Sequence, residues 1–187
     1  MSDVVIRRAT VADVPGIAAL IAGYVEQGVL LPRPVGELYQ SVREFHVAEK
    51  DGEVVACAAL RILWGDLGEV RSLAVRQDQH SKGLGAALVT TVLEDARACG
   101  LPRAIALTRE VAFFERCGFR VVQRETLPRK VWVDCVACPR RHACDEVSVA
   151  IELVPGAAAA ASPPRRSWGL PIQQPEIPGA PALPIVS

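Results

Sequence analysis

The stretch RQDQHSKGLGAAL, residues 76–88, constrains the fold of this chain more than any other part. An apolar strand pattern over 69–75 leads into it, and a helical pattern over 84–99 leads out of it. Gly83 and Gly85 lie at the junction, where glycine lets an anion approach the backbone without a side chain in the way. The first amides of a helix have no intrahelical partner, and the helix dipole favours negative charge there. The loop therefore predicts a diphosphate site, with a plain glycine-containing turn as the alternative.

Two familiar phosphate-binding patterns do not match this loop. In a P-loop the lysine follows the last glycine, whereas Lys82 precedes Gly83 here. The dinucleotide fingerprint needs a third glycine where Leu88 stands, and a tight strand-to-helix turn in place of a longer loop. Both interpretations are disfavoured, which leaves a different kind of diphosphate ligand.

Composition narrows the class of protein. The chain has 187 residues, half of them hydrophobic, which suits one domain with at most an appendage. Its formal net charge is zero, so neither nucleic acid nor a membrane surface is expected as a partner. Residues 1–10 do not resemble a signal peptide, and no apolar run reaches the roughly 20 residues of a membrane-spanning helix. We expect a cytoplasmic protein, whose six cysteines are thiols or metal ligands rather than disulfides.

The rest of the chain alternates strand and helix patterns. Thr10 is a candidate helix N-cap, and Asp51-Gly52 is a turn pair typical of a β-hairpin. The patterns predict strands at 4–8, 45–50, 53–63, 69–75, 104–108, 119–124 and 147–154, and helices at 10–25, 37–43, 84–99 and 110–117. The expected apolar face of the third helix consists of Leu84, Leu88, Thr91, Val92 and Ala96. This order predicts an α/β domain with a mixed sheet over 1–154, followed by a Pro- and Ala-rich disordered tail over 155–187.

Three segments together resemble the GNAT superfamily of acetyl-CoA-dependent N-acetyltransferases. They are SLAV at 72–75, HSKGLG at 80–85 and AFFERCGF at 112–119. The resemblance implies the GNAT fold, with helices flanking a mixed central sheet, and acetyl-CoA as co-substrate. In this family a strand edge pairs with the pantetheine arm, and the loop amides hold the diphosphate. The coenzyme A residues that it implies are Leu73, Ala74, Val75, His80, Lys82, Gly83, Leu84, Gly85, Ala86 and Phe114.

One residue of the loop departs from the family pattern. His80 stands where the family usually has Gln or Arg, with Gln79 just before it. A side-chain contact to the coenzyme is therefore one interpretation of His80, and a solvated loop histidine is the other.

A narrower resemblance connects the chain with the short, stand-alone amino-acid acetyltransferases of arginine biosynthesis. It covers 30–49, 59–75 and KVWVDCVACPRRHACDE at 130–146, which is similar to the cysteine-bearing extension of some members. It implies acetyl transfer to the α-amine of L-glutamate, as in N-acetylglutamate synthases, with glutamine as a related acceptor; dimers are common in the family. Two alternatives stay open: a GNAT enzyme for another amine, such as a peptide N-terminus, polyamine or drug, and a CoA-binding regulatory module without catalysis.

The reaction needs a base, because an amino-acid amine is protonated at pH 7. Glu69 is the candidate, since it begins the strand that carries the coenzyme edge, where the superfamily often has a carboxylate. Strand alternation places Arg71 on the same face, so an ion pair is the alternative. The acid that protonates the leaving thiolate is unassigned, because Phe114 stands where many members have tyrosine; Tyr39 and Ser72 are weak substitutes.

A glutamate acceptor carries two carboxylates, which forked guanidinium groups bind well. Arg33, in a Pro-flanked loop, and Arg71, near the expected transfer point, are the leading candidates, with Arg43 and Arg109 behind them. Ser72 completes the predicted substrate-binding set. Surface charge is the alternative for each arginine.

A cluster of cysteines lies near the end of the expected domain. Cys135, Cys138 and Cys144 fall within one short segment, and Cys-x2-Cys is a spacing typical of zinc sites. His142 or Asp145 would supply the fourth ligand of a structural zinc ion. Free thiols that pack the extension, or a redox-sensitive pair, are the alternatives.

Overall fold

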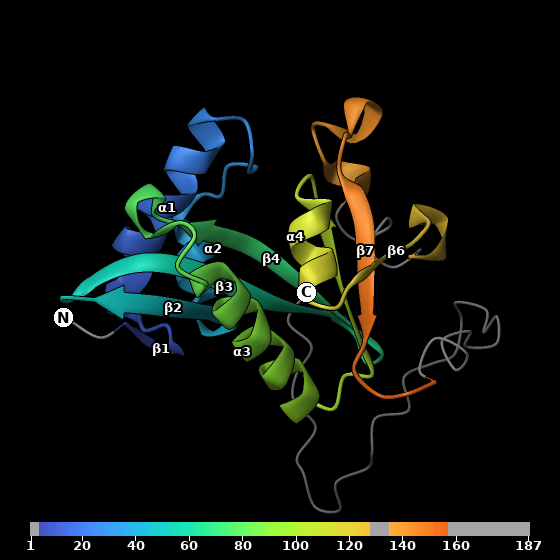
Figure 1. The fold of residues 1–187 in the computed structure, drawn as a ribbon. Helices are drawn as coiled ribbons and strands as arrows, with labels where there is room; N and C mark the ends of the chain where they lie inside the picture. The colour runs from blue at the N-terminus through green and yellow to red at the C-terminus, as the bar shows by residue number, and fades with distance from the viewer. Residues whose placement is uncertain (1–3, 128–134, 157–187) are drawn as a thin grey trace, which may run out of the picture.

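The computed structural model describes residues 4–127 and 135–156, which form a seven-stranded mixed sheet flanked by helices (Figure 1). The strands are β1 (Val5–Arg8), β2 (Phe45–Lys50), β3 (Glu53–Trp64), β4 (Leu67–Val75), β5 (Arg103–Thr108), β6 (Arg120–Val121) and β7 (Val147–Glu152), and the helices are α1 (Val14–Glu26), α2 (Val35–Gln40), α3 (Leu84–Ala98) and α4 (Val111–Arg116). The strand order is β1-β2-β3-β4-β5-β7-β6. Strands β4 and β5 are parallel, and the other neighbours are antiparallel. The α/β class and the mixed sheet predicted from the sequence are confirmed.

The hairpin between β2 and β3 forms where the sequence predicts it. Asp51 and Gly52 both have positive φ, at 54° and 79°. A two-residue turn of this hand matches the twist of the strands that it joins, and Asp-Gly tolerates it well. The turn thus fixes the register of β2 and β3, and β3 in turn pairs with the central strand β4.

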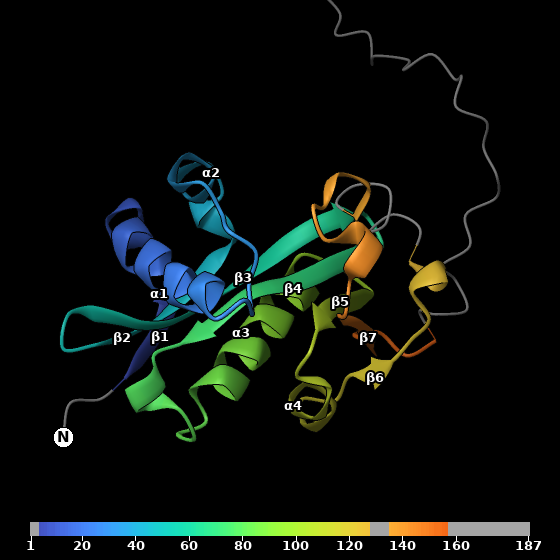
Figure 2. The same ribbon diagram turned by 90° about the horizontal axis from the view of Figure 1, so that it is seen from above.

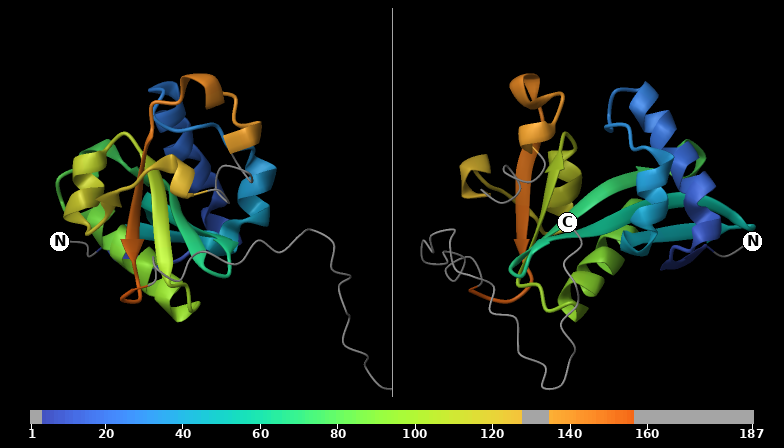
Figure 3. Two further views of the ribbon diagram at one scale, coloured as in Figure 1. Left: turned by 90° about the vertical axis from the view of Figure 1, so that its right-hand side faces the viewer. Right: turned by 180° about the vertical axis from the view of Figure 1, so that it is seen from behind.

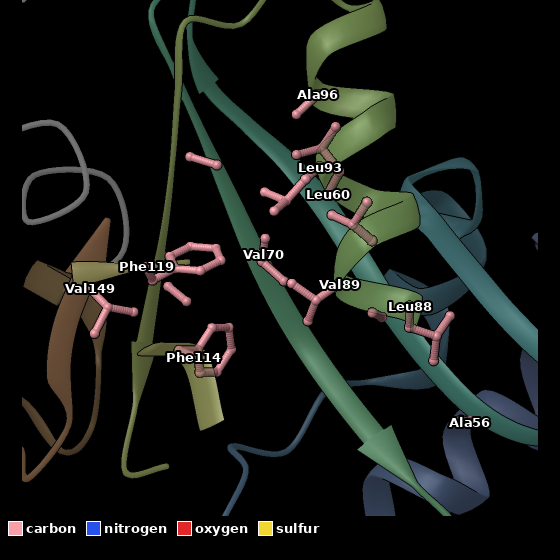
Figure 4. Packing of buried hydrophobic residues seen from close by; sticks show 14 of the residues in the cluster. Ala56, Leu60, Val70, Leu88, Val89, Leu93, Ala96, Phe114, Phe119 and Val149 are labelled. Carbon is pink, nitrogen blue, oxygen red and sulfur yellow. The ribbon is translucent and has the colours of Figure 1, made fainter. Parts of the chain in front are cut away.

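Helices cover the two faces of the sheet. Figures 1 and 2 show α1 and α2 on one face and α3 on the other. On the α3 face, Val89 and Leu93 point toward Leu60 of β3 and Val70 of β4 (Figure 4). The cluster continues through the rings of α4 and its C-terminal connection toward β7. The buried apolar area on both faces holds the sheet rigidly behind the site.

An irregularity in β4 shapes the molecule. Ser72 has φ of 53°, and the three residue steps of β4 from Arg71 to Ala74 span the same length as the two steps of β3 from Ala59 to Cys57. This is a β-bulge, which bends a strand and leaves an extra residue unpaired. The buried Cys57 thiol donates a hydrogen bond to the Ser72 carbonyl at 3.5 Å, and burial raises the pKa of this thiol to about 12.

Strands β4 and β5 separate after their first two paired positions. Their register joins Gly68 to Ala104 and Glu69 to Ile105, and no later residues of β4 pair with β5 within the described parts of the chain. Figures 1 and 3 show the β1–β4 part of the sheet diverging from the β5–β7 part. The bulge and this divergence open a space in the middle of the sheet.

The C-terminal part of the domain differs from its prediction. The strand expected at 119–124 is reduced to β6, Arg120–Val121. Strand β7 lies between β5 and β6 and pairs with both. Most of the predicted tail (157–187) and residues 130–134 of the predicted extension lie outside the described residues. Within the residues described, no helix is both long and apolar enough to cross a bilayer.

Candidate active site

A cleft of about 800 Å³ occupies the space between the diverging strands. Its lining comes from β4, the loop before α3, the ends of α1 and β5, and α4. The predicted site residues that line it are Arg71, Ser72, Leu73, Val75, His80, Gly83, Leu84, Gly85, Ala86 and Phe114. The fold therefore brings together predicted site residues that are up to 43 positions apart in the chain, from Arg71 to Phe114.

The glycine loop builds an anion site at one end of the cleft. Gly83 is the N-cap of α3 with φ of 78°, and its carbonyl accepts the first helical hydrogen bond from the Ala87 amide at 3.0 Å. The amides of residues 84–86 therefore lie in the first turn, where the helix supplies no acceptor. A Cβ on Gly85 would lie 3.4 Å from the ring of Phe113 and 3.7 Å from Val75, so a side chain here would fill the cleft. These features fit a diphosphate on the amides and a narrow arm beside β4.

A hydrogen-bonded group lies at the end of β4. The Tyr24 hydroxyl, from α1, donates to the Val75 carbonyl at 2.7 Å, and His80 Nε2 lies 2.8 Å from the same carbonyl and 2.9 Å from the hydroxyl. His80 is exposed, but its ring is hydrogen-bonded to the end of β4. The local sequence gave no signal for Tyr24, because it reaches β4 from 51 residues away.

Two predicted coenzyme residues have their side chains elsewhere. Ala74 is 1% exposed and packs on the α1 side of the sheet. The Lys82 ammonium donates to the Asp78 carbonyl at 2.8 Å and to Gln79 Oε1 at 3.2 Å, and so holds the loop together. Only the backbone of these two residues is available for the predicted contacts with coenzyme A.

Two arginines meet at the bulge. Arg71 lines the cleft, and Arg33 Nη1 donates to Ser72 Oγ at 3.4 Å while its Nη2 donates to Ser41 Oγ at 3.2 Å. Burial, and next the positive charge of Arg71, lower the pKa of the Arg33 guanidinium. Among the described residues, no carboxylate lies within ion-pair distance of either arginine. The bulge therefore holds two positive charges without an ion-pair partner among the described residues, and Glu44 and Glu37 act on Arg33 only from a longer distance.

Comparison with known proteins identifies the fold and the family. The profile of the Acetyltransferase (GNAT) family matches residues 24–119, which include the bulge, the glycine loop and α4. The chain belongs to this family. It is an acetyl-CoA-dependent N-acetyltransferase with the GNAT fold.

The acetyltransferase has named relatives. An amino-acid acetyltransferase of Mycobacterium tuberculosis is 40% identical over 131 residues, which are 68% of this chain and 75% of the relative. A protein of the same organism, solved with CoA bound, has a TM-score of 0.70 and 32% identity, and the match covers 80% of this chain and 99% of that one. The N-acetylglutamate synthase of Neisseria gonorrhoeae, solved with coenzyme A and N-acetyl-glutamate, has a TM-score of 0.71 and 31% identity. The match covers 82% of the acetyltransferase but 36% of that longer chain.

Glu69 does not line the cleft of the acetyltransferase. It is 3% exposed and lies opposite Arg61 of β3 and Ile105 of β5 in the register. It shares its face of β4 with Arg71, two residues along the strand. Its role as base stays a prediction, and a proton would have to reach it from the cleft through water or neighbouring groups.

Other carboxylates do line the cleft. Glu110 follows β5, where its amide donates to Thr108 Oγ1 at 2.8 Å, and Glu146 precedes β7. Sequence reasoning missed Glu146 because it reaches the cleft only through the placement of β7 beside β5. Phe114 also lines the cleft, whereas Tyr39 is exposed on α2, so Ser72 is the nearer of the two substitutes considered for the missing tyrosine.

The cysteine extension does not show a metal site in the part that the structure describes. No three or more His, Cys, Asp or Glu side chains there are arranged to hold an ion. The Cys144 thiol instead accepts from Arg124 Nη2 at 3.3 Å and lies 3.8 Å from Glu146 Oε2. Zinc at Cys135, Cys138 and Cys144 remains a prediction, to be checked by metal analysis of freshly purified, reduced protein.

Proposed function

We propose that this enzyme transfers the acetyl group of acetyl-CoA to the α-amine of L-glutamate by direct attack, forming N-acetylglutamate. The proposal rests on the Arg33–Arg71 pair, two guanidinium groups without a carboxylate partner among the described residues. The Nε of Arg33 is buried and has no hydrogen-bond partner there either. The names of the relatives, amino-acid acetyltransferase and N-acetylglutamate synthase, agree with this chemistry.

A dianionic acceptor matches the charge of this end of the cleft. Two cations held close together and partly out of water repel each other, and an anion between them removes that cost. Guanidinium forks bind carboxylates through paired hydrogen bonds, which also orient the ligand. A monoanionic or uncharged amine would leave part of this positive charge uncompensated, so the site favours glutamate over such acceptors.

We infer the position of coenzyme A from the residues at the other end of the cleft. We place the diphosphate on the amides of residues 84–86 and the pantetheine arm along Leu73 and Val75. The Tyr24 hydroxyl that bonds to the Val75 carbonyl would then lie beside the arm. Acceptor and donor thus meet at Ser72, where β4 is bulged.

The proposal is tested by measuring thiol release from acetyl-CoA with a panel of acceptors: glutamate, glutamine, aspartate, other amino acids, a peptide, a polyamine and an aminoglycoside. We expect the highest kcat/KM with L-glutamate and a product that mass spectrometry identifies as N-acetylglutamate. A preference for glutamine, or activity only on peptides or amines without carboxylates, would contradict the proposal. Coenzyme binding without turnover on any acceptor would support the regulatory module instead.

Glu69→Gln is expected to lower kcat at pH 7 about 100-fold, in the range typical for loss of a general base. The deficit should shrink above pH 9, where much of the acceptor amine is already deprotonated in solution. The measurement is a pH–rate profile from pH 6.5 to 10 at saturating substrates. Glu94→Gln, the same substitution at an exposed residue of α3, is the matched control. A Glu69→Gln profile parallel to that of the wild type would remove Glu69 from this role, and a pH-dependent loss in Glu146→Gln instead would assign the base there.

A further inference from the structure

The carbonyl of Gly28, in the connection from α1 to α2, accepts hydrogen bonds from two arginines that lie far away in the chain. Arg109 Nη1 donates to it at 2.6 Å, and Arg140 Nη1 donates to it at 3.0 Å. Arg109 follows β5, and Arg140 belongs to the cysteine-bearing extension. One backbone oxygen thus joins three segments of the fold.

The local backbone presents this oxygen to the arginines. Gly28 has φ of 71°, in the left-handed region, and its amide donates back to the Val25 carbonyl at 2.9 Å as α1 ends. Carbonyls just past a helix C-terminus carry the negative end of the helix dipole, which favours nearby cations. A carbonyl oxygen has two lone pairs, so both guanidinium groups can bond to it together.

Arg109 is itself fixed to the far side of the cleft. Arg109 Nη2 donates to Asp145 Oδ1 at 2.8 Å, and this carboxylate raises the pKa of Arg109. Asp145 precedes Glu146, which lines the cleft. The contacts therefore run from the extension, through Arg109, to the α1–α2 connection.

The α1–α2 connection contributes directly to the cleft. Gln27, Val29 and Leu30 line it, and Arg33 follows shortly after. Strands β4 and β5 diverge here, so their own pairing does not hold the two sides of the cleft together. In Figure 3 the extension lies beside this connection. The bonds at Gly28 bridge the gap that the diverging strands leave.

We propose that Arg140 and Arg109 form a clamp on the Gly28 carbonyl that closes the acceptor end of the cleft and holds Leu30 and Arg33 in position. Arg140 is a positioning residue, which acts through the α1–α2 connection rather than on the reacting atoms. The cysteine-bearing extension is therefore part of the acceptor site, whether or not it holds a metal. The assignment of this end to the acceptor rests on the proposed function; the bridging contact itself does not.

The test compares Arg140→Ala, Arg140→Lys and the double variant Arg109→Ala/Arg140→Ala with the wild type. Arg140→Ala should raise the KM of the acceptor that the panel identifies about tenfold, the factor that loss of one charge-assisted hydrogen bond corresponds to. The KM for acetyl-CoA and the kcat at saturating acceptor should stay within about twofold. Arg140→Lys, which keeps a cationic donor, should restore most of the acceptor KM. The double variant should raise it further, and Arg120→Ala on the exposed β6 is the control.

Hydrogen exchange gives a readout that does not need an acceptor. Amides at 27–31 should exchange faster in Arg140→Ala than in the wild type, while those of α3 keep their protection. Unchanged exchange at 27–31 in the double variant, or an acceptor KM that does not move in either variant, would overturn the clamp. A failure of glutamate in the panel would affect the proposed function alone, because the exchange measurement and the KM of whichever acceptor is active still test the clamp.

Discussion

Gly85→Asp is expected to raise the KM for acetyl-CoA about 100-fold, a loss of about 2.7 kcal/mol of binding free energy. A Cβ at this position already lies 3.4 Å from the Phe113 ring, so the longer side chain has to extend into the cleft. Its carboxylate would then lie beside the first amides of α3, where we place the diphosphate, and would repel it while occupying the same donors. Initial rates at varied acetyl-CoA and saturating acceptor measure the effect.

The control for this variant is Gly36→Asp. Gly36 is a helical glycine in the exposed helix α2, and a Cβ there meets nothing within 4 Å. Gly36→Asp makes the same change in charge and volume as Gly85→Asp. Comparing the two variants therefore separates a local block of the coenzyme site from a general loss of stability. We expect the two variants to have similar thermal unfolding midpoints and Gly36→Asp to retain the wild-type KM. A Gly85→Asp enzyme with an unchanged KM for acetyl-CoA would contradict the assignment of the diphosphate to this helix start.

Arg71→Leu is expected to raise the KM for L-glutamate about 100-fold and Arg71→Lys about 10-fold, since hydrogen bonds to a charged group contribute about 1.5–3 kcal/mol. Arg71 has no carboxylate within ion-pair distance among the described residues, so a substrate carboxylate is the partner that its position in the cleft calls for. Lysine keeps the charge but loses the paired geometry of the fork, which accounts for the intermediate value.

The acetyl-CoA parameters provide the internal comparison for Arg71. The KM for acetyl-CoA should change by less than about threefold in both variants, because we place the diphosphate at the opposite end of the cleft. Arg97→Leu, which removes an exposed arginine on α3, should leave both KM values unchanged. If Arg71→Leu left the KM for glutamate at its wild-type value, the carboxylate would have to be bound elsewhere.

The glycine-loop end of the cleft could be predicted because its signals are local. The strand, the glycine loop and the start of α3 follow one another in the sequence, and glycine is needed where φ is positive or space is short. The hairpin at Asp51-Gly52 was predictable for the same reason, since two adjacent residues decide the turn.

The face of α3 was predicted only in part. The prediction included Thr91, which is half-exposed and donates its hydroxyl to the Ala87 carbonyl at 3.1 Å. Val89 and Leu93 are buried in its place. A helix that lies on a broad sheet buries a wide stripe, with adjacent pairs of residues on each turn, whereas a narrow periodic pattern selects a single row. Periodicity thus predicted the helix but not the width of the face that it buries.

The end of the cleft where we place the acceptor depends on contacts between distant segments. Leu30, Arg109 and Glu146 reach the cleft from the α1–α2 connection, from the end of β5 and from the residue before β7. No short pattern contains them, because their proximity is a result of the sheet order. The Cys-x2-Cys spacing shows the converse: a pattern with plausible chemistry does not ensure that the described side chains converge.

The extra residue at Ser72 also reverses the alternation of side chains along β4. Val70 packs toward α3, and so do Leu73 and Val75, although they follow Val70 by an odd number of positions. A regular strand would have placed Leu73 and Val75 on the side of Arg71. Even-numbered Val70 thus faces α3 before Ser72, and odd-numbered Leu73 and Val75 face it afterwards. Deleting this single residue would remove the bulge and leave Leu73 and Val75 on the side of Val70.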